Sequence, residues 1–211
     1  MYPKPIQDFI DNFAKLPGIG PRQAARLAFW LLNDKKNTRE NLKRALEGLD
    51  KEVKTCKFCH FAIENLPAGR QAPESKCPFC DNPARDRKTI CVVEKETDLA
   101  TIEKSGVYKG LYHVLGGLFS ALDIAIPKNL KIPELVERIS GRTGKEKIEE
   151  VILAISPTHE GDLTARYLER LLKPLKIKTT RIGRGLPYGS EVEFADAKTL
   201  SGALESRKEI K

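Results

Sequence analysis

Hydrophobic positions at the start of the chain repeat with the three- and four-residue spacing of helices. One stripe runs through residues 6–15 and ends before Pro17 and Gly18, and a second runs through residues 24–31 behind Pro21. Proline suits a first helical turn because the missing N–H has no helical partner there. We therefore expect two short helices joined by a tight, glycine-bearing hairpin.

A third helix is predicted after Asn37, which forms a capping box with Glu40. Its apolar positions again repeat at three and four; they are Leu42, Ala45, Leu46, Leu49 and Val53. We expect this stripe to pack on the first two helices and to serve the core.

The second half of the chain changes to short continuous apolar runs, which are typical of buried parallel strands. These runs lie at residues 90–93, 110–117, 150–156 and 178–182, and each is followed by a stretch with helical spacing. The fourfold alternation predicts a mostly parallel sheet with helices on both faces. The fold class is α+β and multidomain, with a helical N-terminal domain and an α/β C-terminal domain.

Two Cys-x-x-Cys pairs, seventeen residues apart, lie between the two halves. They are Cys56, Cys59, Cys77 and Cys80. This spacing favours a closed, structural zinc site, because four sulfurs leave no position for a substrate. Disulfides and a thioredoxin-like redox pair are the alternatives; no secretory signal is visible, and a redox enzyme needs one pair. His60 could replace a cysteine as a ligand, but we expect it on the surface, and we expect Cys91 in the core.

Acidic residues follow two of the predicted strands. Glu94 follows the first strand, and Glu160 and Asp162 follow the third. The carboxyl ends of parallel strands meet at one sheet edge, where three carboxylates suit Mg²⁺, although each acid alone is an ordinary solvated loop residue. The pattern resembles the Toprim domain, which carries Asp-x-Asp where this chain has Glu-Gly-Asp, so we do not infer catalysis from the resemblance.

Composition narrows the choice of partners. The chain has 211 residues, a formal charge of +8 and a pI near 9.2, and residues 1–54 hold eleven Lys and Arg against seven Asp and Glu. Such a balance favours an acidic polymer as partner. No long uncharged apolar run and no targeting segment are visible, so we expect a cytoplasmic protein that does not cross a membrane.

Residues 16–29, LPGIGPRQAARLAF, resemble the helix-hairpin-helix motif, which binds DNA backbones without reading sequence. Amide groups of the hairpin and of a helix N-terminus suit a phosphate oxygen, and Arg22 and Arg26 lie four residues apart. The candidate DNA-binding residues are Lys15, Gly18, Gly20, Arg22 and Arg26. The alternative is that the hairpin only packs helices or forms an oligomer interface.

The order of these parts resembles the RecR recombination-mediator family. The most specific motifs are LPGIGP, DNPARD followed by ICVVE, GLYHVLGG and RGLPYGSEVEFAD. The match covers nearly the whole chain. It implies domains at 1–54 (helix-hairpin-helix), 55–86 (zinc finger), 87–183 (Toprim) and 184–211 (a Walker-B-like segment). The gap between the cysteine pairs is longer than usual in the family, and we expect residues 64–76 to form an exposed excursion that leaves the zinc geometry intact.

The resemblance also implies a function. The protein would not be an enzyme but would self-associate, as dimers and a tetrameric ring, to clamp single- or double-stranded DNA. With RecO, and often RecF, it would load RecA onto single strands. Glu94, Glu160 and Asp162 would contact RecO, and the C-terminal segment would help to close the ring. Two other hypotheses remain open: a Mg²⁺-dependent Toprim nuclease or primase-like enzyme, and a zinc-stapled scaffold without DNA affinity.

Overall fold

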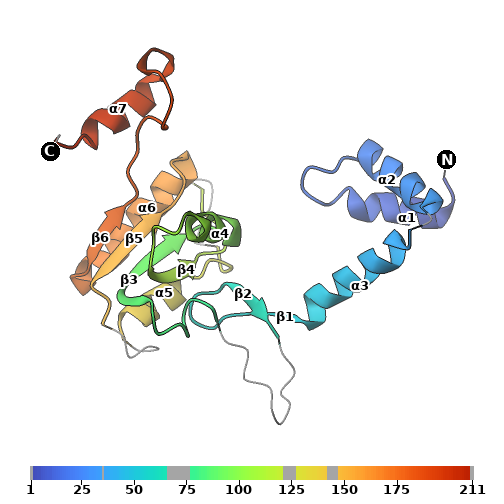
Figure 1. The fold of residues 1–211 in the computed structure, drawn as a ribbon, viewed down its shortest axis with the longest axis horizontal. Coiled ribbons are helices and arrows are strands. Elements are labelled where there is room, and N and C mark those ends of the chain that lie inside the picture. Colours follow the sequence, from blue (N-terminus) through green and yellow to red (C-terminus); the bar gives the residue numbers. More distant parts are fainter. Residues whose placement is uncertain (1, 35, 66–76, 121–126, 142–146, 210–211) are drawn as a thin grey trace, which may run out of the picture. The chain divides into compact units, whose positions relative to one another are not determined.

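A computed structural model describes residues 2–34, 36–65, 77–120, 127–141 and 147–209 (Figure 1). The chain divides into two compact units, Met1–Val53 and Lys54–Lys211. Residues 66–76, most of the excursion predicted between the cysteine pairs, lie outside the described residues. Within the described ranges, every helix is too short or too polar to cross a bilayer.

The first unit begins with the two predicted helices, α1 (Lys4–Phe13) and α2 (Pro21–Asn33). They pack on each other through Ile10 of α1 and through Ala24, Ala28 and Leu31 of α2, which are all buried. Of the two hairpin glycines, Gly18 has a φ of +79°, as expected, whereas Gly20 has a φ of −87° and is the N-cap of α2. Only Gly18 therefore needs the left-handed conformation.

Helix α3 (Thr38–Lys51) differs from its prediction in two respects. It buries none of its side chains: Leu46 is 52% exposed and Leu49 is 64% exposed, so the predicted core stripe is wrong for this unit alone. The predicted capping box is also wrong. Asn37 is left-handed and caps nothing, and the Thr38 amide donates to Asp34 Oδ2 at 3.1 Å instead.

The second unit is built on a four-stranded sheet of β3 (Asp86–Val93), β4 (Gly110–Val114), β5 (Glu150–Ala154) and β6 (Lys178–Arg181). The strand order is β4-β3-β5-β6, and every neighbouring pair is parallel. The predicted parallel sheet is confirmed. A further two-stranded sheet, β1 (Val53–Thr55) with β2 (Ala62–Glu64), was not predicted, because its strands are too short to show alternation.

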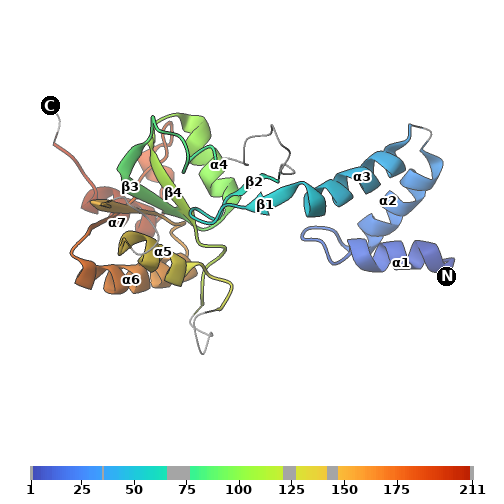
Figure 2. The same ribbon diagram turned by 90° about the horizontal axis from the view of Figure 1, so that it is seen from below.

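The two faces of the main sheet are covered differently. Helices α5 (Ile132–Ile139) and α6 (His159–Leu172) pack on one face, where Ile90 and Val92 point (Figure 2). On the other face, Cys91 and Val93 contact a core shared by α4 (Glu96–Ser105) and the four-cysteine segment. The four-cysteine segment and α4 together therefore cover this face of the sheet.

The C-terminal segment ends in a 3₁₀ turn, Val192–Phe194, and helix α7 (Ala197–Glu205), which buries no side chain. Asp196 caps α7 by accepting from the Lys198 and Thr199 amides. Tyr188, Val192, Phe194 and Leu204 are all strongly exposed. This segment therefore carries apolar side chains that its own chain leaves uncovered.

Candidate metal centre and nucleic-acid interface

The four cysteines of the two pairs come together in one buried cluster. Their sulfur atoms all lie within 4.8 Å of one another, and all five cysteines of the chain are free of disulfide bonds. Hydrogen bonds with Cys59, Cys77 and Cys80 lower the pKa of Cys56. Four converging sulfurs, with a thiolate favoured among them, are a donor set for a tetrahedral metal ion, and the disulfide alternative is not supported.

The two pairs form matching knuckles, residues 56–60 and 77–81. In the first, the Phe58 amide lies 3.5 Å from Cys56 Sγ and the His60 amide donates to the Cys56 carbonyl. In the second, the Cys80 amide lies 3.4 Å from Cys77 Sγ and the Asp81 amide donates to the Cys77 carbonyl. Amides aimed at sulfur stabilise its negative charge, which metal binding requires.

The first knuckle also pairs with an edge strand of the main sheet. Strand β4 lies at one edge, and the Val114 amide donates to the Cys59 carbonyl at 2.8 Å. Phe79 of the second knuckle packs edge-on against Tyr112 of β4. The knuckles thus cover a strand edge that would otherwise present unpaired amides to solvent.

Arg138 of α5 joins the cluster to the sheet from the other side. It is 4% exposed, and its Nη1 donates to the carbonyls of Phe58 at 3.0 Å and Tyr112 at 2.8 Å. Its Nη2 lies 3.6 Å from Cys80 Sγ. A buried guanidinium beside the cluster offsets part of the negative charge of the sulfurs.

A second arginine, Arg85, is half-buried and holds the segment that follows the second knuckle. Arg85 makes two bonds to the Glu103 carboxylate, at 2.9 and 2.7 Å, and its Nε donates to the Gly110 carbonyl. The Tyr112 hydroxyl donates to the same carboxylate at 2.8 Å. These bonds therefore hold the segment around Arg85, helix α4 and strand β4 together beside the cysteine cluster.

Two predictions about single residues have different outcomes. Cys91 is buried in the sheet as expected, and burial raises the pKa of its thiol to about 12, so it is a poor nucleophile. His60 was expected on the surface, but it is half-buried and packs edge-on against the fully buried His113 at 5.1 Å. The ring completes the packing of the first knuckle on β4.

The three acidic residues are not gathered into one cluster as the cysteines are. In the described part of the chain, the cysteines are the one group of three or more potential ligands close enough to share an ion. Glu94 is half-buried at the end of β3, whereas Glu160 is exposed in the first turn of α6. The gathering of carboxylates expected at this sheet edge is therefore not observed.

Asp162 already has partners within its own chain. It accepts from Arg181 at 2.9 Å and from Arg184, so it links α6 to the end of β6 and to the C-terminal segment. Partial burial raises the pKa of its carboxyl, but the two arginines outweigh this effect and hold the pKa below its ordinary value. The Asp162 carboxylate therefore stabilises contacts between elements of its own chain. Gly161 beside it has no room for a Cβ, which would collide with the Ser156 carbonyl.

The hairpin of the first unit leaves its polar groups free. No side chain caps the N-terminus of α2, so its first amides are open to an anion. Arg22 and Arg26 are exposed and have no ion pair or hydrogen bond within the described residues. Lys15 is exposed as well and contacts Asn12 at 3.3 Å. All predicted DNA-binding residues therefore lie in one short, solvent-facing segment.

Fold and site together define a Toprim-type α/β protein with a four-cysteine centre and an N-terminal helical hairpin. Three family models match successive parts of the chain: RecR, helix-hairpin-helix at residues 6–49, the Toprim domain at 88–183, and RecR, C-terminal at 185–208. A relative from Chloroherpeton thalassium, named Recombination protein RecR, is 44% identical over 205 residues, 97% of each chain. One of the same name from Desulfitobacterium hafniense is 42% identical over 209 residues, 99% of this chain and 98% of its own. The chain belongs to the RecR family.

Sequence reasoning missed Arg138 and Arg85. Arg138 carried a usable signal, because it lies three residues after Leu135 and one before Ile139, on the buried face of an amphipathic helix. A charge at such a position indicates a buried partner. Arg85 carried no such signal, because its role depends on Glu103, which is distant in sequence.

Removal of the metal ligands should destabilise the second unit. Cys56→Ala, or treatment with a strong chelator, is expected to cost on the order of several kcal/mol of unfolding free energy, because metal binding is coupled to folding. Thermal melting with a metal assay measures both effects. Cys91→Ala is the matched control and should keep its full metal content. Unchanged melting of the metal-free protein would contradict this structural role.

Arg138→Met should weaken metal binding although it replaces none of the four cysteine ligands. It leaves the Phe58 and Tyr112 carbonyls unpaired, so we expect a loss of about 3 kcal/mol and a roughly 10- to 100-fold lower metal affinity. Chelator competition measures the affinity. Arg138→Lys, which keeps the charge without the fork, should be intermediate. Arg170→Met, at an exposed site on α6, should release metal like the parent protein; if Arg138→Met does so too, Arg138 has no role at the centre.

Proposed function

We propose that this protein is a DNA-binding recombination mediator that acts in DNA repair. The observation that carries the proposal is the hairpin at residues 16–26, where an uncapped helix N-terminus lies beside two exposed arginines that have no ion pair within the described ranges. This arrangement suits phosphate oxygens and reads no base, so the predicted binding is independent of sequence. The net charge of +8 supports the same partner.

The metal in the four-cysteine centre is proposed to be zinc. Four sulfur ligands in a buried, closed cluster suit Zn²⁺, which takes tetrahedral thiolate sites and has no redox chemistry. Its contribution would be structural, since no ligand position is left for a substrate. We therefore propose no enzymatic activity.

The partners proposed for the Toprim face are RecO and, in some systems, RecF, and the outcome would be loading of RecA on single strands. Glu160 is exposed and Glu94 is partly open, so both are accessible to basic side chains of a partner. Asp162 is engaged with Arg181 and Arg184. We propose that Asp162 supports this surface by fixing the start of α6.

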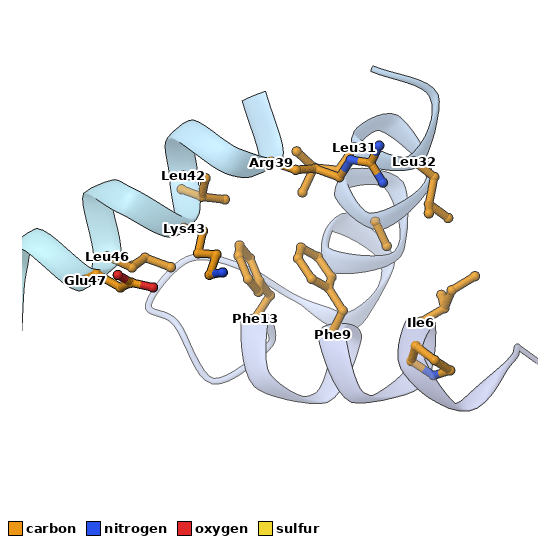
Figure 3. A pocket seen from close by; sticks show the side chains of 12 residues that line it. Ile6, Phe9, Phe13, Leu31, Leu32, Arg39, Leu42, Lys43, Leu46 and Glu47 are labelled. Atoms are coloured by element: carbon orange, nitrogen blue, oxygen red, sulfur yellow. The ribbon is translucent and has the colours of Figure 1, made fainter. Parts of the chain in front are cut away.

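Self-association is proposed to bury the uncovered apolar surfaces. A groove of about 490 Å³ lies among α1, α2 and α3, with Phe9 and Phe13 pointing toward Leu42 and Leu46 (Figure 3). Within the first unit this groove is open, and several apolar side chains of the C-terminal segment are exposed as well. Apolar surface of this kind is typical of interfaces, and a second copy of the chain is the proposed occupant.

Arg22→Ala and Arg26→Ala should each weaken DNA binding by the loss of a phosphate contact. We expect each to lower the slope of log affinity against log salt by about 1, with a similar effect on all sequences. Fluorescence anisotropy at several salt concentrations measures this. Arg170→Ala removes the same charge from an exposed site on α6 and should bind like the parent protein. Equal effects of all three substitutions would show that only net charge matters.

Leu46→Glu should shift the protein toward the monomer. A charge in the apolar groove must be desolvated when a second copy binds, whereas Leu46 is already 52% exposed within one chain, so the fold should persist. Light scattering across protein concentration gives the mass. Leu49→Glu, on the same helix but outside the groove, is the control. A parent protein that is a monomer throughout would contradict self-association.

A further inference from the structure

Helix α2 presents an exposed stripe that the phosphate contacts alone do not explain. Arg22, Arg26 and Trp30 follow one another at four-residue spacing, so they share one face of the helix. Trp30 is 57% exposed and is the single tryptophan of the chain. Its ring and its indole N–H have no partner within the described residues.

This stripe borders a groove of its own. The groove has a volume of about 800 Å³ and is lined by α2 and by Tyr2, which packs edge-on against Phe29 at 5.4 Å. None of its lining residues also lines the apolar groove beside α3. The two surfaces differ in chemistry as well, because the Trp30 groove combines aromatic rings with two unpaired guanidinium groups.

Exposed aromatic rings beside arginines suit one partner in particular. Bases of single-stranded DNA stack on aromatic side chains while the backbone follows positive charge, and this mode tolerates any sequence. In a duplex the bases are already stacked on each other and only their edges can be reached from the grooves. Tryptophan and arginine are also common at the centres of protein interfaces, so the oligomeric state is measured as well in the test below.

We propose that Trp30 is a base-stacking residue that gives the hairpin a preference for single-stranded DNA. The inference rests on the proposed DNA binding and extends it. Arg22 and Arg26 hold phosphates, and one unpaired base stacks on the indole. Arg22 and Trp30 lie about 12 Å apart along the helix axis, which a few nucleotides span.

The single tryptophan makes the contact directly measurable. Titration of the full-length protein with oligothymidylate should quench the Trp30 emission, whereas a duplex of equal length should quench it far less. An abasic oligonucleotide of the same length keeps the phosphates but has no bases. It should bind through the arginines and leave the emission nearly unchanged.

Substitutions separate stacking from charge. Trp30→Ala should weaken single-strand binding by about tenfold, measured by anisotropy of a labelled oligonucleotide, and should leave duplex binding and the salt slope unchanged. Trp30→Phe keeps an aromatic face and should retain most of the affinity. Because Trp30 is exposed, both variants should melt like the parent protein.

Four outcomes would overturn the proposal in different ways. If the parent protein binds single strands without loss of Trp30 emission, or if Trp30→Ala binds them normally, the stacking role is wrong and the phosphate-binding hairpin stands. Failure to bind either form of DNA would overturn the proposed function and this inference together. If Trp30→Ala changes the mass of the protein in light scattering, the face belongs to an interface between copies.

Discussion

The gathering of four buried cysteine sulfurs beside strand β4 is the constraint on which the second unit depends. Thiolates in a buried site are unfavourable unless a cation and hydrogen bonds compensate their charge. Here backbone amides and the Arg138 guanidinium supply part of that compensation, and the arrangement of the sulfurs leaves the rest to a metal ion. The same cluster packs on one face of the sheet, so a bound metal ion would also stabilise the packing of that face.

The first unit, in contrast, has little buried interior and is mostly surface. Its core is small: Ile10, Ala24, Ala28 and Leu31 bury the contact of two short helices, and α3 adds no buried side chain. What it does present is surface of two kinds, an apolar groove on one side of α2 and a basic, aromatic stripe on another. A unit with so little interior and such distinct faces is suited to contacts with other molecules, which accords with the proposed DNA binding and self-association.

Much of this organisation could be predicted from the sequence. Apolar residues spaced three and four apart predicted α1 and α2, and short apolar runs predicted the four parallel strands. The spacing of the cysteines predicted their cluster. Each of these signals is local and is set by backbone geometry. The errors arose where tertiary contacts decide. The apolar stripe of α3 correctly predicted a helix, but a hydrophobic pattern does not show whether the surface that covers the stripe belongs to the same chain or to another molecule. The topology of the sheet predicted that Glu94, Glu160 and Asp162 would gather at one edge. In the structure Asp162 instead forms ion pairs with Arg181 and Arg184.

Native mass spectrometry of the full-length protein, alone and with a single-stranded oligonucleotide, tests the central claim most directly. A metal-centred, self-associating DNA clamp predicts assemblies of the 23.6 kDa chain in whole-number multiples, with one zinc ion for each chain and with DNA bound to the assembly. Zinc-free chains that remain folded, or monomers that bind no DNA, would contradict it.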